Sequence, residues 1–149
     1  MTGLATYPLA WPEGVPRGTT RAQSPFRIAL PRAVADLEDA LHLFGTDTGL
    51  PVTGVVISSN VTLGASRPAD QGVAVYFDWD GARRCIAIDR FALVEANVWA
   101  IYLILEGRRQ ELRNGGLPIA RAAFQGFAAL ISQPIAHTLD ATAKAAQRP

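Results

Sequence analysis

The residues of this sequence that could do chemistry are few and lie far apart. The two histidines, His42 and His137, stand in different parts of the chain, and the one cysteine, Cys85, has no activating neighbour. No glycine-rich phosphate loop, Cys/His metal spacing or Ser-His-Asp arrangement can be assembled. Asp78 and Asp80 could bind a metal, but a cross-strand ion pair and a turn residue explain them better. We therefore expect no catalytic residue, no metal and no cofactor.

Arginine is the residue type best able to bind a charged partner. Seven Arg and four acidic residues lie within residues 81–121, whereas residues 35–80 hold seven acidic residues and one Arg. Guanidinium groups bind phosphates through paired hydrogen bonds, although a coding bias toward Arg, or ordinary solvated Arg paired with Glu, would look the same. We predict a nucleic-acid surface with these basic and stacking residues: Arg83, Arg84, Arg108, Arg109, Arg113, Tyr76 and Trp79.

Three further polar residues, Asn60, Arg90 and Asn97, are candidates for a small polar pocket. Asn97 interrupts an otherwise apolar helical stretch, and a buried amide needs hydrogen-bond partners. It either bonds to a loop backbone, such as the strand end at residues 58–60, or helps to line a ligand pocket. We favour the structural role, and Arg90 has the same two alternatives.

The composition is that of one folded domain. The chain has 149 residues, 49% of them hydrophobic and 18% charged, and its formal net charge is +1, so no strong field surrounds the whole molecule. A single cysteine excludes an intrachain disulfide, and the longest apolar run, residues 98–105, is too short to span a bilayer. Without a signal-peptide pattern at the N-terminus, a cytoplasmic protein with no membrane partner is expected.

The chain divides into three parts. Residues 1–30 are rich in Pro, Gly and Thr and predict an extended arm, because residues that precede Pro avoid the helical region. Tyr7, Leu9 and Trp11 alternate along this arm, which either seals the core or grips a partner. Residues 31–131 form one domain, and residues 132–149 form an Ala-rich tail.

Three helices are expected in the domain. Apolar residues at helical spacing predict helices over residues 31–44, 90–113 and 118–131. Pro31 suits the first turn of the first helix and Gly45 its C-terminal cap. Asp89 suits the N-cap of the second helix, which is the longest.

Three strands are expected over residues 52–58, 73–78 and 82–88. The Asp80-Gly81 pair between the last two is typical of a two-residue hairpin turn, and it would pair Val75 with Ile86 and Asp78 with Arg83. One side of this hairpin is core-facing and collects Val73, Val75, Phe77, Ile86 and Ile88; the other collects Ala74, Tyr76, Cys85 and Ala87. The fold class is therefore α+β, a small antiparallel-containing sheet packed against three helices.

Apolar surface is in excess in two places. Residues 98–105 are apolar almost all round the predicted helix, and the second side of the hairpin is also moderately apolar. The arm, a helix or a second protomer could cover that side. We expect a homo-oligomer because of this excess.

Several segments resemble a family of small, largely uncharacterised proteins of bacterial prophages and mobile elements. The matching segments, which span residues 7–130, are YPLAWPEGVPR, VVISSN, GVAVYF, then Asp89-Arg90, Val94, Asn97, Ala100-Ile101, Glu106 and Arg109, and finally AFQGFAAL. Some members look as though a J-domain follows the last segment. None follows here, so a chaperone-recruiting role is not expected.

These observations predict a non-catalytic module. Together with the mobile-element resemblance, the Arg-rich segment favours nucleic-acid binding in phage-like replication, recombination or regulation, with DNA or RNA as the partner. The alternative is a protein-interaction adaptor whose partner is a host or phage protein. A nucleic-acid-processing enzyme is the third option.

Overall fold

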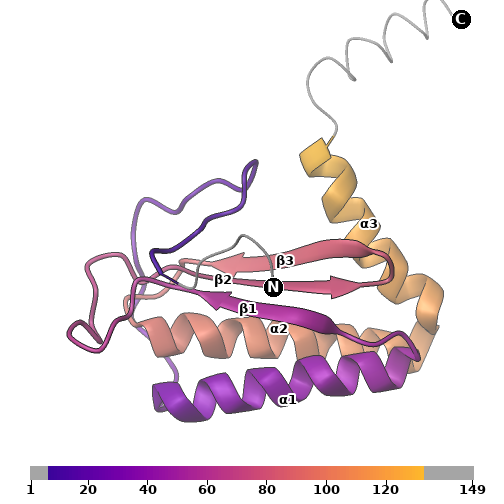
Figure 1. Ribbon diagram of the computed structural model, residues 1–149, viewed down its shortest axis with the longest axis horizontal. Coiled ribbons are helices and arrows are strands. Elements are labelled where there is room, and N and C mark those ends of the chain that lie inside the picture. Colours follow the sequence, from indigo (N-terminus) through magenta and orange to yellow (C-terminus); the bar gives the residue numbers. More distant parts are fainter. Residues whose placement is uncertain (1–6, 133–149) are drawn as a thin grey trace, which may run out of the picture.

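The computed structural model describes the backbone of residues 7–132 and the side chains of residues 7–124. A three-stranded antiparallel sheet has the first two helices on one face and the N-terminal arm on the other, and the third helix rises past its end (Figure 1). The elements in chain order are α1 (Leu30–Thr48), β1 (Thr53–Ser58), β2 (Val73–Trp79), β3 (Ala82–Ile88), α2 (Val94–Gly115) and α3 (Leu117–Ser132). The predicted α+β class, with three strands and three helices, is confirmed.

The hairpin forms in the predicted register. Asp80 and Gly81 have φ values of 54° and 79°, which a type I′ turn requires at both central positions. Val75 pairs with Ile86, and Asp78 pairs with Arg83. β1 joins the other side of β2, so the strand order is β1-β2-β3. The turn chemistry and the alternation of apolar residues therefore determine this half of the sheet.

The core lies between the inner face of the sheet and the helices. The inner side of β2 contributes Val73, Val75, Phe77 and Trp79, all fully buried, as predicted for the first three. The Phe124 ring of α3 lies 6.0 Å from that of Phe77 and 5.4 Å from that of Trp79. α2 lies beneath the sheet, and α1 packs against α2 (Figure 1).

Two predicted helix boundaries are wrong. α1 passes through Gly45 to Thr48, and the left-handed residue that caps it is Gly49, with φ 76°. Gly45 lies inside the helix, where its lack of a side chain lets the following segment pack closely: a Cβ there would lie 2.8 Å from the backbone nitrogen of Val52. α2 begins at Val94 rather than residue 90, because the carboxylate of Asp89 bonds to the arm instead of capping the helix.

The arm covers the outer face of the sheet. The Tyr76 hydroxyl donates to the carbonyl of Ala10 at 2.6 Å, and the Ala10 N–H donates to Ser58 Oγ at 2.7 Å. Leu9 and Ala10 pack on the small outer cluster of Val56, Ala74 and Tyr76. The second side of the hairpin is therefore closed by the arm, one of the three covers considered above.

The apolar middle of α2 is mostly core. Val98, Ile101 and Leu105 are buried, and Trp99 and Tyr102 stack on each other with ring centroids 4.5 Å apart. Only Leu103 in this stretch is exposed, at 43%. Most of the apolar surface that predicted an oligomer is thus buried within the described part of one chain, and self-association stays a prediction.

Candidate functional site: the groove between α1 and β1

The prediction that Tyr76 and Trp79 are stacking residues of a nucleic-acid surface is wrong. Trp79 is 1% exposed and donates its indole N–H to Thr48 Oγ1 at 3.1 Å. Tyr76 is 8% exposed, with its hydroxyl bonded to the arm. Neither ring presents a face to solvent, so neither can stack on a base. Both side chains instead pack and hydrogen-bond within the protein.

The two hairpin arginines bond to the protein itself. Arg83 lies 3.2 Å from the Asp78 carboxylate and donates to the Gly54 carbonyl at 2.6 Å. Arg84 donates to the Trp79 carbonyl at 3.0 Å, with its guanidinium 5.5 Å from the centre of the Trp79 ring. These contacts hold the turn and cover the edge of the core.

The predicted arginines of α2 also have partners. Arg109 binds Asp47 of α1 and Glu106 at 2.9 and 2.8 Å. Arg108 lies 3.2 Å from Glu111, and Arg113 donates to Gln110 at 2.7 Å. The five arginines therefore divide between the hairpin turn and α2, and four of them are paired with a carboxylate or engaged by backbone carbonyls and rings.

Two of the three polar-pocket candidates, Asn60 and Asn97, bond to the backbone of other segments. Asn97, fully buried, accepts from the Phe91 N–H at 2.9 Å and donates to the carbonyls of Phe91 and Gln71 at 3.0 and 2.8 Å. Asn60 accepts from Leu9 at 3.0 Å, and Arg90 is exposed above the Phe91 ring. Asn97 thus bonds to a loop backbone, as favoured, but to residues 71 and 91 rather than to the strand end at 58–60.

An ion cluster missed by the sequence reasoning fastens the arm to the domain. Arg17 bonds to Asp89 at 2.8 Å and to Asp70 at 2.6 Å, and Arg21 reaches Asp70 at 3.3 Å. The hydrogen bond from Arg17 lowers the pKa of Asp70 below its ordinary value. Because its partners are dozens of residues apart in the chain, no local pattern could have found this cluster.

Cys85 is not a nucleophile. Burial raises the pKa of its thiol to about 12, so the thiolate is absent at neutral pH. The thiol is partly buried on the outer face of the hairpin beside Tyr76, the side on which the sequence pattern places it.

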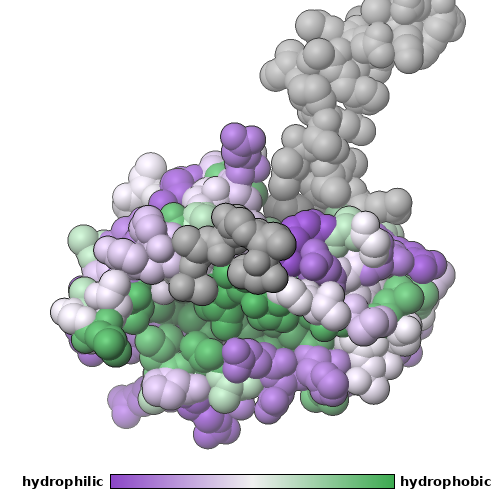
Figure 2. Space-filling model, viewed as in Figure 1, coloured by the Kyte–Doolittle hydropathy of each residue, from purple (hydrophilic) through white to green (hydrophobic). Residues whose placement is uncertain are grey.

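A groove lies between α1 and β1. Its volume is about 530 Å³, and Figure 2 shows it as an apolar band above the polar side chains of α1. The lining residues are Val34, Glu38, Leu41, His42, Val52, Val55, Val56 and Ile57. All except Glu38 and His42 are apolar. Val55 is 38% exposed, so the groove presents part of its apolar lining to solvent.

The groove runs along an open sheet edge. The two-residue turn makes Trp79 and Ala82 a hydrogen-bonded pair, so every second residue of β2 bonds toward β3 and the residues between them, Tyr76 included, bond toward β1. Val56 is the partner of Tyr76, and its neighbour Ile57 therefore directs its N–H and C=O away from the sheet. Among residues 7–132, no further strand pairs with that edge.

The open edge carries few of the features that protect sheet edges. β1 reads TGVVIS, without a charge or a proline, the residues that usually discourage pairing at an edge. Its protection is a bulge between Thr53 and Val56. Two residues of the apolar stripe on α1, Val34 and Leu41, line the groove as well as packing in the core.

No protein-family model, curated protein or solved structure matches this chain. The resemblance to prophage proteins therefore stays a prediction. Within the described part of the chain, no helix is both long and apolar enough to cross a membrane. In the same part, no three His, Cys, Asp or Glu side chains gather closely enough to hold a metal ion.

Proposed function

We propose that this protein is a non-catalytic interaction module that binds an extended segment of a partner protein by adding it as a strand to β1. The observation that carries the proposal is the coincidence of an uncharged edge strand with an apolar groove of about 530 Å³ beside it. Backbone hydrogen bonds to the edge would supply affinity, and side chains entering the groove would supply specificity.

A bound strand has a defined place. Neighbouring strands lie about 4.8 Å apart, so a fourth strand would lie over the stripe of Val34, Leu41 and His42 on α1. Alternate side chains of that strand would enter the groove and the others would face solvent. α1 thus supplies the floor on which a fourth strand would pack.

Nucleic-acid binding is the rival function. The excess of arginine over acidic residues in residues 81–121 supports it, and the burial of both predicted stacking residues, Tyr76 and Trp79, counts against it. Titration of single- and double-stranded DNA and RNA at low and moderate salt tests it directly. Binding that weakens with salt and falls for the double variant Arg83→Ala, Arg84→Ala would favour the rival.

The test of strand addition uses peptides selected from a displayed random library against the full chain. We expect binding of the selected peptides to slow hydrogen exchange at the Ile57 amide, which points away from β2. The amides of Val56 and Ser58 already face β2 and serve as internal controls. Unchanged exchange at Ile57 in a saturated complex would refute strand addition.

A variant pair locates the binding surface. Val55→Lys places a charge on the open edge and should lower peptide affinity at least tenfold, while changing stability by less than about 0.5 kcal/mol because Val55 is partly exposed. Leu63→Lys is the matched control, since Leu63 is an exposed apolar residue outside the groove. Equal affinity of both variants for the peptides would place the site elsewhere.

A further inference from the structure

We infer that the partner segment carries a lysine or arginine between two apolar residues, in the pattern apolar-x-basic-x-apolar, and that Glu38 recognises the basic residue. This inference rests on the proposed strand addition at β1. It concerns which extended segment the groove selects.

The charge on the groove comes from α1. Glu38 lines the groove and is exposed, and the next residue, Asp39, is exposed as well. Asp36, on the same helix, is already paired with Arg32 at 2.9 Å. Within the part of the chain whose side chains are described, neither Glu38 nor Asp39 has an ion-pair partner. An incoming cation would therefore meet unpaired negative charge.

The spacing on α1 matches the spacing of a strand. Residues three or four apart on a helix lie about 5–6 Å apart, so Val34, Glu38 and Leu41 form a row of apolar, acidic and apolar groups along the groove, in which Leu41, 1% exposed, lies at the floor. Alternate residues of a strand lie about 6.6–6.8 Å apart on one side. Three successive inward side chains can therefore meet that row, and the central one faces Glu38.

A second copy of this chain fits the groove less well. Its own β1 would bring TGVVIS, which has no basic residue to meet Glu38. Its α1 would bring a second set of acidic side chains, Glu38 and Asp39, toward the first. Like charges brought together at an interface oppose association. A separate basic segment avoids both problems.

The experiment compares four short synthetic peptides on the full chain. Three have the inward pattern Val-x-Lys-x-Val, Val-x-Gln-x-Val or Val-x-Glu-x-Val, with Thr at each x. The fourth has the composition of the first, with its Lys moved to an x position so that it faces solvent. We expect affinity to fall about two- to fivefold from Lys to Gln and again from Gln to Glu, as for partly exposed ion pairs.

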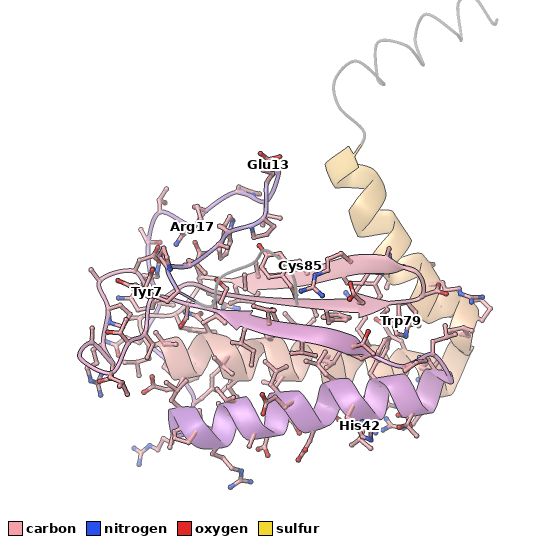
Figure 3. The ribbon with its side chains drawn as sticks, viewed as in Figure 1. Tyr7, Glu13, Arg17, His42, Trp79 and Cys85 are labelled. Atoms are coloured by element: carbon pink, nitrogen blue, oxygen red, sulfur yellow. The ribbon has the colours of Figure 1, made fainter. Side chains whose placement is uncertain are left out.

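Variants assign the preference to one carboxylate. Glu38→Gln should bring the Lys and Gln peptides to the same affinity, and Glu38→Lys should reverse the order of the three. Glu13→Gln is the matched control, because Glu13 is an exposed acid on the arm, on the opposite side of the sheet from α1 (Figure 3). The control should keep the wild-type order.

The outcomes separate the two proposals. Equal affinity of all four peptides would overturn the basic-segment inference and leave strand addition standing. No binding by any of them or by library peptides would overturn strand addition. A dimer in light scattering that Val55→Lys dissociates, with no peptide bound, would identify a second copy as the occupant and overturn the inference.

Discussion

The two edges of the sheet differ in what lies beside them. At β3, the arm and α3 border the strand, and the hollow between them holds only about 180 Å³, with Val15, Arg108 and Phe124 among its lining residues. At β1 the groove is about 530 Å³, and α1 forms a floor that no other segment within residues 7–132 covers. β3 also carries Arg83 and Arg84, whereas β1 carries no charge. Edge protection in this fold is thus concentrated on one side.

This asymmetry follows from where the arm is fastened. The arm crosses the outer face of the sheet and is held at Asp70 and Asp89 by Arg17, whose place on the arm is labelled in Figure 3. It also caps the end of β1 through Ser58 and Asn60. Its described path leaves the middle of β1 open, at Val55 and Ile57. The open edge is a consequence of how the rest of the sheet is covered.

The largest effect is expected at the turn that builds the protected edge. Gly81→Val should destabilise the fold by about 1–3 kcal/mol, because Gly81 has φ 79° and a β-branched residue is strained there. A Cβ at Gly81 meets no atom within 4 Å, so the cost is conformational rather than steric contact. Chemical denaturation measures the change.

Ala82→Val is the control for this turn. Ala82 is an exposed strand residue, and a β-branched side chain suits a strand, so we expect a change within about 0.5 kcal/mol. Equal destabilisation by the two substitutions would mean that side-chain volume, and not positive φ, limits the hairpin.

Much of the fold was predictable because it depends on local signals. The Asp-Gly turn and the alternation of Val73, Val75 and Phe77 define the hairpin and its core side. The same alternation places Trp79 on the core side, so its burial could have been foreseen from the pattern. Assigning Trp79 to a stacking surface overlooked that parity.

The remaining errors arise from contacts between distant segments. The α2 start was misplaced because Asp89 bonds to Arg17 and Gly18 rather than to its own helix. Gly45, predicted as the cap of α1, instead lies inside the helix at a close contact with the backbone of Pro51 and Val52, where a Cβ would not fit. The groove depends on how α1 lies relative to β1, which no single segment encodes. The sequence predicts the helix and the strand that line the groove, but not that they lie side by side.

The second effect concerns the arm that makes the two edges unequal. Asp89→Asn should cost about 1–2 kcal/mol, since the charge-assisted bonds from Arg17 and the Gly18 N–H weaken while one acceptor oxygen remains. Thermal or chemical unfolding measures the loss. Arg32→Ala is a suitable control, because the Arg32–Asp36 pair lies on the exposed side of α1.

The pH dependence of this effect has a definite sign. Burial alone raises the pKa of Asp89, but the bonds from Arg17 and Gly18 outweigh it and lower the pKa below the ordinary value. The carboxylate therefore stabilises the fold above its unfolded pKa of about 3.9, and the contribution is lost as pH falls through the lower folded pKa. The wild type and Asp89→Asn should differ by a constant amount above about pH 5 and converge in stronger acid. A difference that grew below pH 4 would contradict the assignment.

The smallest expected effect tests whether β3 is protected by its charged side chains or by the arm and α3 beside it. Arg83→Val removes a charge from β3 and breaks both the exposed ion pair with Asp78 and the hydrogen bond to the Gly54 carbonyl, which together should cost about 1 kcal/mol. If the arm and α3 protect the edge, the variant should show the same association state as the wild type in light scattering across a dilution series. Arg113→Val controls for loss of charge, since Arg113 lies on α2 and bonds only to Gln110 among the described side chains. New association of Arg83→Val, absent from Arg113→Val, would show that charge protects β3. The contrast between the edges would then lie in the side chains of the two strands rather than in the path of the arm, and a neutral β3 would compete with β1 for an added strand.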